Sequence, residues 1–189
     1  MKPAASATAL LIVDLQAAID DPSWASAGPR NNPEAERNIA RLLAHWRGRG
    51  MPVIHVRHES REPGSTYRPG QPGFEFKPAT APRRGETVVT KHVPDAFIGT
   101  QLLDLLRSAA IGTVVVTGVI TNNSVEATAR TAGNLGFATC VVSDATATFA
   151  RRDHAGRLRT ADEVHAMSLA NLDGEYARIQ TTAEVLATS

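Results

Sequence analysis

The chain has 189 residues, of which 42% are hydrophobic and 21% are charged, and its formal net charge at neutral pH is +1. This length fits a single domain spanning residues 1–189 around one hydrophobic core, and the composition is that of an ordinary globular protein. The small net charge and the lack of a basic stripe in the sequence argue against nucleic acid as a partner, and they imply no bulk attraction to a membrane surface.

Cysteine content and the N-terminal sequence bear on the compartment of the protein. One cysteine, Cys140, excludes an internal disulfide and is compatible with a reducing cytoplasm, where we expect the protein. The apolar run 9–13 is interrupted by Asp14 and is too short for a membrane helix. It also lacks the long apolar core and the cleavage site of a signal peptide. We therefore expect a buried strand at this position and no membrane partner.

Short β-branched runs alternate with longer amphipathic segments in the first half of the chain. A strand is predicted over 9–13, a helix over 33–48 with Pro33 near its first turn, and a second strand over 52–56. Residues 58–86 are rich in Gly, Pro and charge and show no clear period, which predicts a long loop. A loop of this length within a compact domain is more often functional than idle.

The same alternation continues in the second half. The predicted elements are strand 87–91, helix 98–109, strand 113–117, helix 124–135, strand 138–143, helix 161–171, strand 176–180 and helix 182–187. Strands that alternate with helices indicate a parallel sheet, and unbroken apolar strands indicate burial on both faces. We therefore predict an α/β protein, a Rossmann-like three-layer α/β/α sandwich around a six-stranded parallel sheet.

Polar side chains follow several predicted strands where those strands end or in the turn beyond. They are Asp14, Lys91, Ser124 and Asp144. Ligands of parallel α/β sheets bind outside the carboxyl ends of the strands, so these positions indicate a binding site. We assign Asp144 a structural role at a strand–loop junction.

The most informative segment is 114–130. A β-branched strand ends in Gly118, the chain turns through Thr-Asn-Asn, and Ser124 then lies in the first turn of a helix. Such a strand–turn–helix directs backbone N–H groups and the positive end of the helix dipole at one point. That point suits a developing oxyanion, and Ser124 is placed to attack a group bound there.

Asp14 and Lys91 suit proton transfer, whereas Ser124 leaves the chemistry open. A carboxylate beside a lysine stays ionised, and the pair can take a proton from a thiol or hydroxyl and return it to a leaving group. A serine hydroxyl is a far weaker acid than a thiol and normally needs a dedicated base. Ser124 is therefore a nucleophile for acyl transfer, a bystander while Asp14 acts as general acid, or a disabling change in a binding protein.

Segment 114–130 resembles the nucleophile turn of the isochorismatase-like hydrolases, the superfamily of nicotinamidases and N-carbamoyl amidases. Most of these proteins carry Cys where this chain has Ser124. Asp14 matches the aspartate that ends the family's first strand, and Lys91 matches the lysine after its third strand. The resemblance covers nearly the whole chain. It implies that Asp14, Lys91 and Ser124 are the catalytic residues.

The same resemblance implies the geometry of the nucleophile turn. The peptide between Val119 and Ile120 is expected to be cis, and the N–H groups of Ile120 and Ser124 are expected to form the oxyanion hole. Asn122 and Asn123 depart from the Thr-Asp-x-Cys pattern that is common in amidases. This departure favours a natural, divergent subgroup over a laboratory change of Cys to Ser.

The function implied is that of a hydrolase acting on a C–N amide-type or vinyl-ether bond of a small molecule. The vinyl ether is included because true isochorismatases of the superfamily cleave one without the cysteine. The alternative is a catalytically disarmed family member, natural or engineered, that binds a small molecule. Residues 161–177 resemble family segments near subunit contacts, so a homo-oligomer, a dimer or tetramer, is also expected.

Polar and aromatic side chains near the predicted site are candidates for the substrate pocket. They are Gln16, Trp24, His58, Phe74, Phe76 and Phe97. Aromatic side chains there would form the walls of a pocket for a planar substrate, and ordinary packing beneath the 58–86 loop is the equal alternative. Phe74 and Phe76 flank one residue, so an extended chain would direct both rings to the same side.

The stretch His55-Val-Arg-His-Glu59 is the candidate for a metal site. Two histidines and a glutamate can hold Zn²⁺. However, the Asp-x-His motif by which nicotinamidases bind metal is absent, and Arg57 places a positive charge within the stretch. We therefore expect neither a metal nor another cofactor, and we expect His58 to contact substrate or to support the loop.

Overall fold

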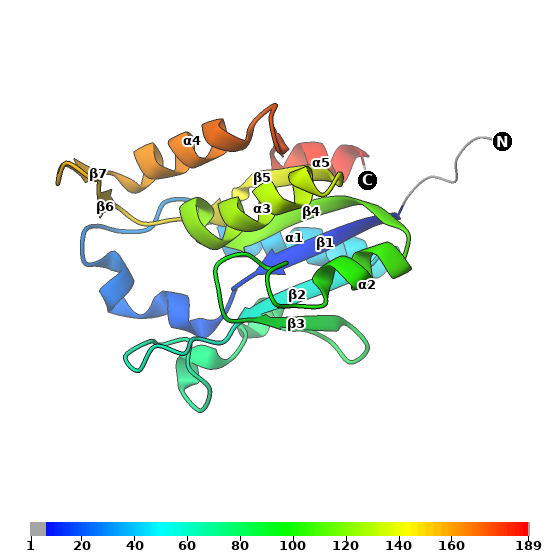
Figure 1. Cartoon of the computed structure of the whole chain (residues 1–189), viewed down its shortest axis with the longest axis horizontal. Helices are drawn as coiled ribbons and strands as arrows, with labels where there is room; N and C mark the ends of the chain where they lie inside the picture. The colour runs from blue at the N-terminus through cyan, green and yellow to red at the C-terminus, as the bar shows by residue number, and fades with distance from the viewer. Residues whose placement is uncertain (1–6, 189) are drawn as a thin grey trace.

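Six parallel strands form the centre of the molecule, in the order β3-β2-β1-β4-β5-β8 (Figure 1). The structure is a computed structural model that describes residues 7–188. The strands are β1 (Ala7–Val13), β2 (Val53–His58), β3 (Thr87–Lys91), β4 (Ile111–Val119), β5 (Ala138–Ala147) and β8 (Arg178–Gln180). The predicted α/β class and the predicted six-stranded parallel sheet are confirmed.

Helices cover both faces of the sheet and complete three layers (Figure 1). One face packs against α1 (Ala35–Gly48) and α5 (Thr182–Thr188), and the other against α2 (Leu102–Ser108), α3 (Glu126–Asn134) and α4 (Ala161–Leu172). Within residues 7–188, no helix has the length and apolar character needed to span a bilayer.

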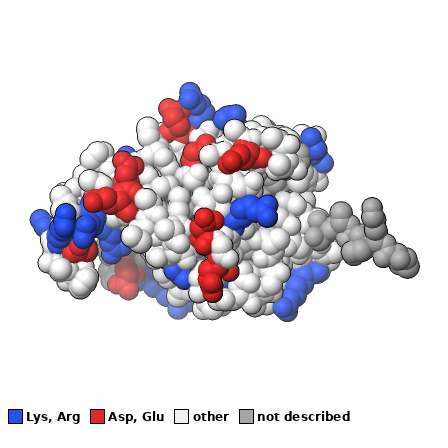
Figure 2. Space-filling view, turned by 90° about the horizontal axis from the view of Figure 1, so that it is seen from above, with Lys and Arg blue, Asp and Glu red and all other residues white. Residues whose placement is uncertain are grey.

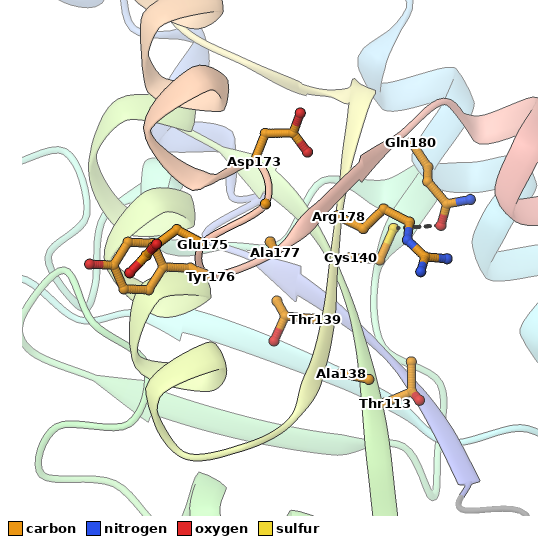
Figure 3. A pocket seen from close by; sticks show the side chains of 11 residues that line it. Thr113, Ala138, Thr139, Cys140, Asp173, Glu175, Tyr176, Ala177, Arg178 and Gln180 are labelled. Atoms are coloured by element: carbon orange, nitrogen blue, oxygen red, sulfur yellow. Dashed lines mark hydrogen bonds between the residues drawn. The ribbon is translucent and has the colours of Figure 1, made fainter.

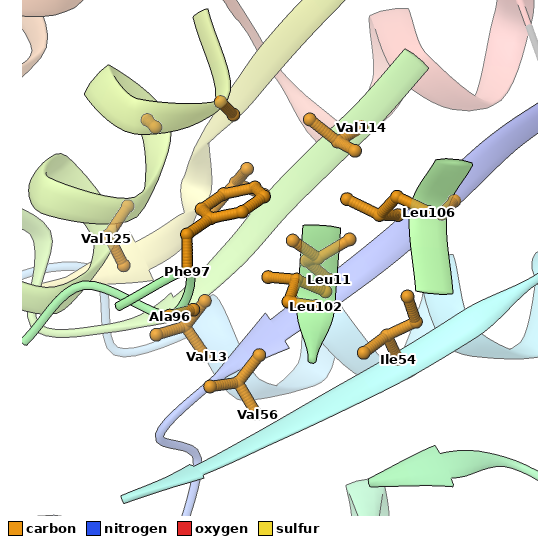
Figure 4. Packing of buried hydrophobic residues seen from close by; sticks show 14 of the residues in the cluster. Leu11, Val13, Ile54, Val56, Ala96, Phe97, Leu102, Leu106, Val114 and Val125 are labelled. Carbon is orange, nitrogen blue, oxygen red and sulfur yellow. The ribbon is translucent and has the colours of Figure 1, made fainter. Parts of the chain in front are cut away.

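The core consists of two apolar layers, one on each side of the sheet. Along β1, Leu11 and Val13 face α2 and α3, whereas Leu10 and Ile12 face α1. The first of these layers is shown in Figure 4, where Leu11 and Val13 lie among side chains from the neighbouring strands and from α2 and α3. Because both faces are buried, β1 reads as a continuous apolar run rather than an alternating one.

Two local predictions are wrong. Helix α2 begins at Leu102 instead of residue 98, because Gly99 has a positive φ of 68° that no right-handed helix accommodates. Strand β5 continues to Ala147, so Asp144 lies within the strand. The Asp144 carboxylate accepts hydrogen bonds from the backbone N–H and the hydroxyl of Thr182 at 2.7 and 2.8 Å, and it thereby caps α5.

Short elements in the connections were not predicted. Single turns of 3₁₀ helix occur at Ala17–Asp20, Pro22–Ala25, Pro72–Phe74 and Pro78–Thr80. An antiparallel hairpin of β6 (Arg151–Arg152) and β7 (Leu158–Arg159) precedes α4. Basic side chains gather at the end of the molecule where this hairpin lies, and acidic and basic residues are interspersed over the rest of that face (Figure 2).

Gly118 brings the end of β4 against the end of β1. In the sheet register Gly118 pairs with Val13, the residue before Asp14. Its φ is +115°, and a Cβ atom at this position would lie 2.0 Å from the Val13 carbonyl oxygen. Only glycine allows this approach, so Gly118 determines how closely the turn after β4 lies to Asp14.

Candidate active site

The three candidate catalytic residues meet at the carboxyl edge of the sheet. Asp14 follows β1, Lys91 ends β3, and Ser124 lies in the turn after β4. The Lys91 ammonium donates hydrogen bonds to Asp14 Oδ2 at 2.7 Å, to Ser124 Oγ at 3.2 Å and to the Val93 carbonyl at 3.1 Å. Lys91 is fully buried, and these acceptors take all the donors that an ammonium offers.

Asp14 combines burial with a special backbone conformation. Its φ is 53°, in the left-handed region that Asp tolerates better than most residues. The residue is buried, with 4% of its surface exposed to solvent. Among residues 7–188, no hydrogen-bond partner reaches its Oδ1 atom. Burial raises the pKa of the Asp14 carboxyl above its ordinary value, and the adjacent Lys91 opposes this shift. The carboxylate is therefore a stronger proton acceptor than an exposed one.

The nucleophile turn consists of residues 120–125. The peptide between Val119 and Ile120 is cis, and Thr121–Val125 form one turn of π-helix that leads directly into α3. Ser124 is 6% exposed, and it faces the same cavity as Ile120. The hydroxyl of Ser124 thus lies between the Lys91 ammonium and the cavity.

A cavity of about 440 Å³ opens above Asp14 and Ser124. Its lining includes six of the predicted site residues and nine other residues. They are Asp14, Trp24, His58, Ser60, Arg61, Glu62, Ser65, Tyr67, His92, Val93, Pro94, Val119, Ile120, Asn123 and Ser124. The volume suits a small molecule.

An aromatic wall forms one side of this cavity. The Trp24 ring stacks on Phe149 at 6.0 Å and meets the edge of Tyr67 at 6.2 Å, and Tyr67 in turn meets His58 at 5.5 Å. The Tyr67 hydroxyl also donates a hydrogen bond to the Asp14 backbone carbonyl at 3.4 Å. Sequence reasoning missed Tyr67, because it lies in the 58–86 loop, where no period distinguishes one aromatic residue from another.

His58 presents a neutral imidazole to the cavity. Burial, with a smaller effect of Lys91, lowers its pKa to about 4, so the ring is uncharged at neutral pH. Within the described part of the chain, its Nδ1 atom has no hydrogen-bond partner. A neutral ring with a free nitrogen is suited to form a hydrogen bond with a bound molecule.

Comparison with known proteins shows which family the chain belongs to. Residues 8–184 match the isochorismatase domain. The chain belongs to the isochorismatase family.

The similarity of this family member to known proteins extends over nearly its full length. The isochorismatase-family protein YrdC of Bacillus subtilis is 44% identical over 178 residues, which is 94% of each chain. A crystal structure of an isochorismatase-family protein from Chromobacterium violaceum is 58% identical, has a TM-score of 0.92 and covers 98% of this chain and 94% of its own. Maleamate amidohydrolase of Pseudomonas putida is 28% identical over 94% of this chain and 84% of its own. This family member is therefore a hydrolase.

Gln16, which the sequence suggested as a pocket residue, lies beneath the cavity of this hydrolase instead of lining it. Its amide donates to the backbone carbonyls of His58 at 3.1 Å and Phe74 at 2.9 Å, and it accepts from the His58 N–H at 2.8 Å. The side chain is fully buried, so its amide is occupied by the backbone. Gln16 holds His58 in place.

The three suggested phenylalanines also lie outside the cavity lining. Phe74 and Phe76 do turn to the same side, where the Arg57 guanidinium lies 4.6 and 5.9 Å from their ring centroids. Phe97 stacks on Phe137 at 6.2 Å within the core between the sheet and α3. Of the suggested pocket side chains, the lining thus includes Trp24 and His58.

The histidines considered for a metal site are separated by the fold. His55 is fully buried and lies 2.9 Å from Glu86, which also forms a double ion pair with Arg47. His58 faces the 440 Å³ cavity instead. Over residues 7–188, the structure brings together no group of three His, Cys, Asp or Glu side chains that could hold a metal ion.

A second cavity of about 660 Å³ lies at the amino-terminal ends of β4 and β5 (Figure 3). Cys140 lies in its wall and donates a hydrogen bond to the Gln180 side chain at 3.2 Å. Burial raises the pKa of this thiol to about 11, so it stays protonated at neutral pH. The catalytic candidates all lie at the opposite ends of the strands, where the 440 Å³ cavity includes Asp14 and Ser124 in its lining.

Proposed function

We propose that this hydrolase cleaves a C–N amide-type bond of a small molecule by acyl transfer through Ser124. The observation that carries the proposal is the position of Lys91, whose ammonium bridges Asp14 at 2.7 Å and Ser124 at 3.2 Å at the base of the cavity. A cation at this distance lowers the pKa of a hydroxyl, and the buried carboxylate beside it accepts the proton.

In the first step, Ser124 Oγ forms a bond to the substrate carbonyl carbon and its proton passes to Asp14. The carbonyl π electrons move onto the oxygen, which faces the backbone N–H groups of Ile120 and Ser124. Preorganised N–H donors stabilise such an oxyanion without reorganisation. Lys91 remains an ammonium throughout and stabilises the negative charge that moves between Ser124 and Asp14.

In the second step, the oxyanion collapses and the C–N bond breaks. Asp14 returns its proton to the leaving nitrogen, so that a neutral amine departs and an acyl ester of Ser124 remains. Water then attacks the ester carbonyl, its proton passes to Asp14, and the C–O bond to Ser124 breaks as that proton returns to Oγ. The products are an acid and an amine, and the protein is regenerated.

Two features of the chain support an amide-type substrate. The cavity volume of about 440 Å³ and its wall of Trp24 and Tyr67 suit a small, flat molecule. A relative, maleamate amidohydrolase, is named for the hydrolysis of an amide. A vinyl ether is the second candidate substrate, because the raised pKa of Asp14 also suits a general acid.

The competing proposal is a disarmed relative that binds a small molecule without cleaving it. The observation behind it is the hydroxyl of Ser124, since family members with Cys there start from a much more acidic nucleophile. The Lys91–Asp14 pair would then contribute to binding only. Both proposals place the ligand in the same cavity, so they differ in the fate of the ligand.

A hydrolysis screen over small amides, ureido acids and isochorismate distinguishes these proposals. The purified protein is compared with Ser124→Ala, Ser124→Cys and Asp14→Asn. We expect turnover of an amide by the unaltered protein and none by Ser124→Ala. Activity retained in Ser124→Ala would instead mean acid catalysis by Asp14, and activity confined to Ser124→Cys would mean a disarmed amidase. An active Asp14→Asn protein would contradict every catalytic mechanism considered.

A further inference from the structure

Helix α4 directs polar side chains towards the nucleophile turn. His165 and Ser168 lie on its buried side and are 9% and 2% exposed, whereas Met167 on the outer side is 64% exposed. Buried helix faces are normally apolar. Both buried polar side chains contact Thr121, the first residue of the turn that ends at Ser124 and Val125. No catalytic step described above uses either of them.

The contacts around His165 favour one tautomer. The ring forms a hydrogen bond with the Ser143 backbone, and because Nδ1 faces Thr121, we assign the ring proton to Nε2. Asn32 Nδ2 also lies 3.4 Å from Nε2, but it donates to the carbonyls of Ser143 and Thr146, each at 2.8 Å. His165 Nδ1 is therefore an acceptor, and the Thr121 hydroxyl donates to it at 2.9 Å.

The carbonyl of Thr121 is held from the same helix. Ser168 Oγ lies 3.2 Å from this carbonyl and 2.6 Å from Glu126 Oε2, at the beginning of α3. Glu126 is itself paired with Arg130 at 2.7 Å. The side chain and the backbone of Thr121 are thus both attached to α4, through bonds that solvent does not reach.

We propose that His165 is a positioning residue, whose bond to the Thr121 hydroxyl holds the turn so that the group at position 124 stays beside Lys91. Thr121 is fully buried, and within residues 7–188 its hydroxyl has one hydrogen-bond partner, the His165 ring. Loss of the acceptor leaves a buried hydroxyl unsatisfied, which the turn relieves by moving. The proposal rests on the proposed function for its role in catalysis, but the geometry is testable without a substrate.

The test uses a thiol as a reporter of its distance from Lys91. In the full-length Ser124→Cys protein, the rate of alkylation by iodoacetamide is measured against pH, which gives the apparent pKa of the introduced thiol. Lys91 and the helix N-terminus lower this pKa when the turn is in place. Cys140 does not interfere, because burial raises its pKa to about 11.

Two second-site variants remove the bond from either side. Thr121→Val removes the donor with little change of shape, and His165→Phe removes the acceptor but keeps a planar ring. We expect each to raise the apparent thiol pKa by about one unit, which is a tenfold change in thiolate population at neutral pH. Combined, they should raise it no further than one alone, because both act through one bond.

Matched variants separate positioning from general damage. Thr121→Ser retains the hydroxyl, and His165→Asn retains an acceptor near Nδ1, so both should return the thiol pKa towards that of Ser124→Cys. His55→Phe replaces another buried histidine, which is bonded to Glu86 away from the site, and should leave it unchanged. Thermal melts by circular dichroism establish that each variant is folded.

The outcomes decide the proposal independently of the proposed function. Folded Thr121→Val and His165→Phe variants with an unshifted thiol pKa would overturn it, and so would an equal shift in His55→Phe. If the thiol pKa shifts as expected but no substrate is hydrolysed, His165 positions the turn and the proposed acyl transfer is what fails.

Discussion

Replacement of Lys91 by Met tests whether the Lys91–Asp14 pair is as tightly coupled as its geometry indicates. Lys91 is fully buried and Asp14 is 4% exposed, and their charged atoms lie 2.7 Å apart. Met fills nearly the same volume without charge. Lys91→Met therefore removes three hydrogen bonds and leaves an uncompensated carboxylate in a buried position.

The expected loss of stability is about 3–5 kcal/mol near pH 8, the range found when one partner of a buried ion pair is removed. This loss should depend on pH. Burial raises the pKa of Asp14, and Lys91 opposes that effect, so the variant has a still higher Asp14 pKa. A carboxyl whose folded-state pKa is raised favours the folded state at low pH and loses that contribution as pH rises through the folded pKa. The loss should therefore shrink as the pH is lowered.

Urea unfolding at several pH values measures these free energies. The matched variant is Lys91→Met combined with Asp14→Asn, which removes both charges, and Asn tolerates the positive φ of residue 14. We expect the double variant to recover most of the stability near pH 8. A loss below about 1 kcal/mol for Lys91→Met, or no recovery in the double variant, would refute the argument, because a weakly coupled pair behaves in this way.

Three further predictions concern parts of the molecule outside the catalytic set. The Arg47 hydrogen bonds lower the pKa of Glu86 from 4.5 to about 2. Their contribution to the stability of the folded state is therefore present above pH 4.5 and is lost as the pH falls towards 2. In Glu86→Gln, the midpoint of urea unfolding should fall less steeply as the pH is lowered. Gly118→Ala would place a Cβ 2.0 Å from the Val13 carbonyl and should cost more than about 3 kcal/mol in thermal or urea unfolding. We also expect a homo-oligomer that uses the outer face of α4, so Met167→Glu should lower the mass measured by light scattering.

Each of these has a control and a contrary result. An acid limb equally steep in Glu86→Gln would show that other carboxylates dominate. Gly48→Ala serves beside Gly118→Ala, because a Cβ at Gly48 meets no atom within 4 Å and should be tolerated. If the unaltered protein is a monomer, the proposed homo-oligomer is contradicted. Its interface would use the groove of about 850 Å³ beside Met167, in which Arg151 of the hairpin and Glu163 of α4 supply opposite charges.

The sheet was predictable because its strands carry their signal locally. Runs such as 113–116 and 87–90 consist of β-branched residues, and burial on both faces of the inner strands keeps residues 114–116 continuously apolar. Positions at the strand ends followed from the same signal, since parallel strands end at one edge. The strand ends placed Asp14, Lys91 and Ser124 at this edge, and the resemblance to the family's catalytic residues selected them; the structure brings all three together.

The pocket wall was less predictable because it depends on how the 58–86 loop folds. Phe74 and Phe76 looked like pocket aromatics, yet the guanidinium of Arg57 attracts both rings. Nothing in the sequence around Tyr67 distinguishes it from the rest of the loop, but its hydroxyl reaches the backbone carbonyl of Asp14. Gln16 looked available for substrate, and only the folded loop supplies the carbonyls that occupy its amide. Long-range contacts of this kind leave no periodic trace in the sequence.

The hairpin before α4 was missed for a related reason. Residues 151–159 hold four arginines and show no apolar alternation, so no strand signal is present. Its pairing depends on the turn at Gly156, where the φ of +81° suits glycine, and on Asp153, which accepts from the backbone N–H groups of Ala155 and Arg157.

The position of Lys91 on the edge strand β3 has a consequence for how the protein becomes active. Asp14 and Lys91 are 77 positions apart in the chain, and β3 is the edge strand of the sheet, beside β2. Contacts of such long sequence separation form late, because a large loop must close first. A chain that has collapsed around β1 and β4 but has not yet added its outer strand holds Asp14 and Ser124 without their shared cation. Recovery of activity during refolding should therefore follow the docking of β3, and partly folded chains should be inert.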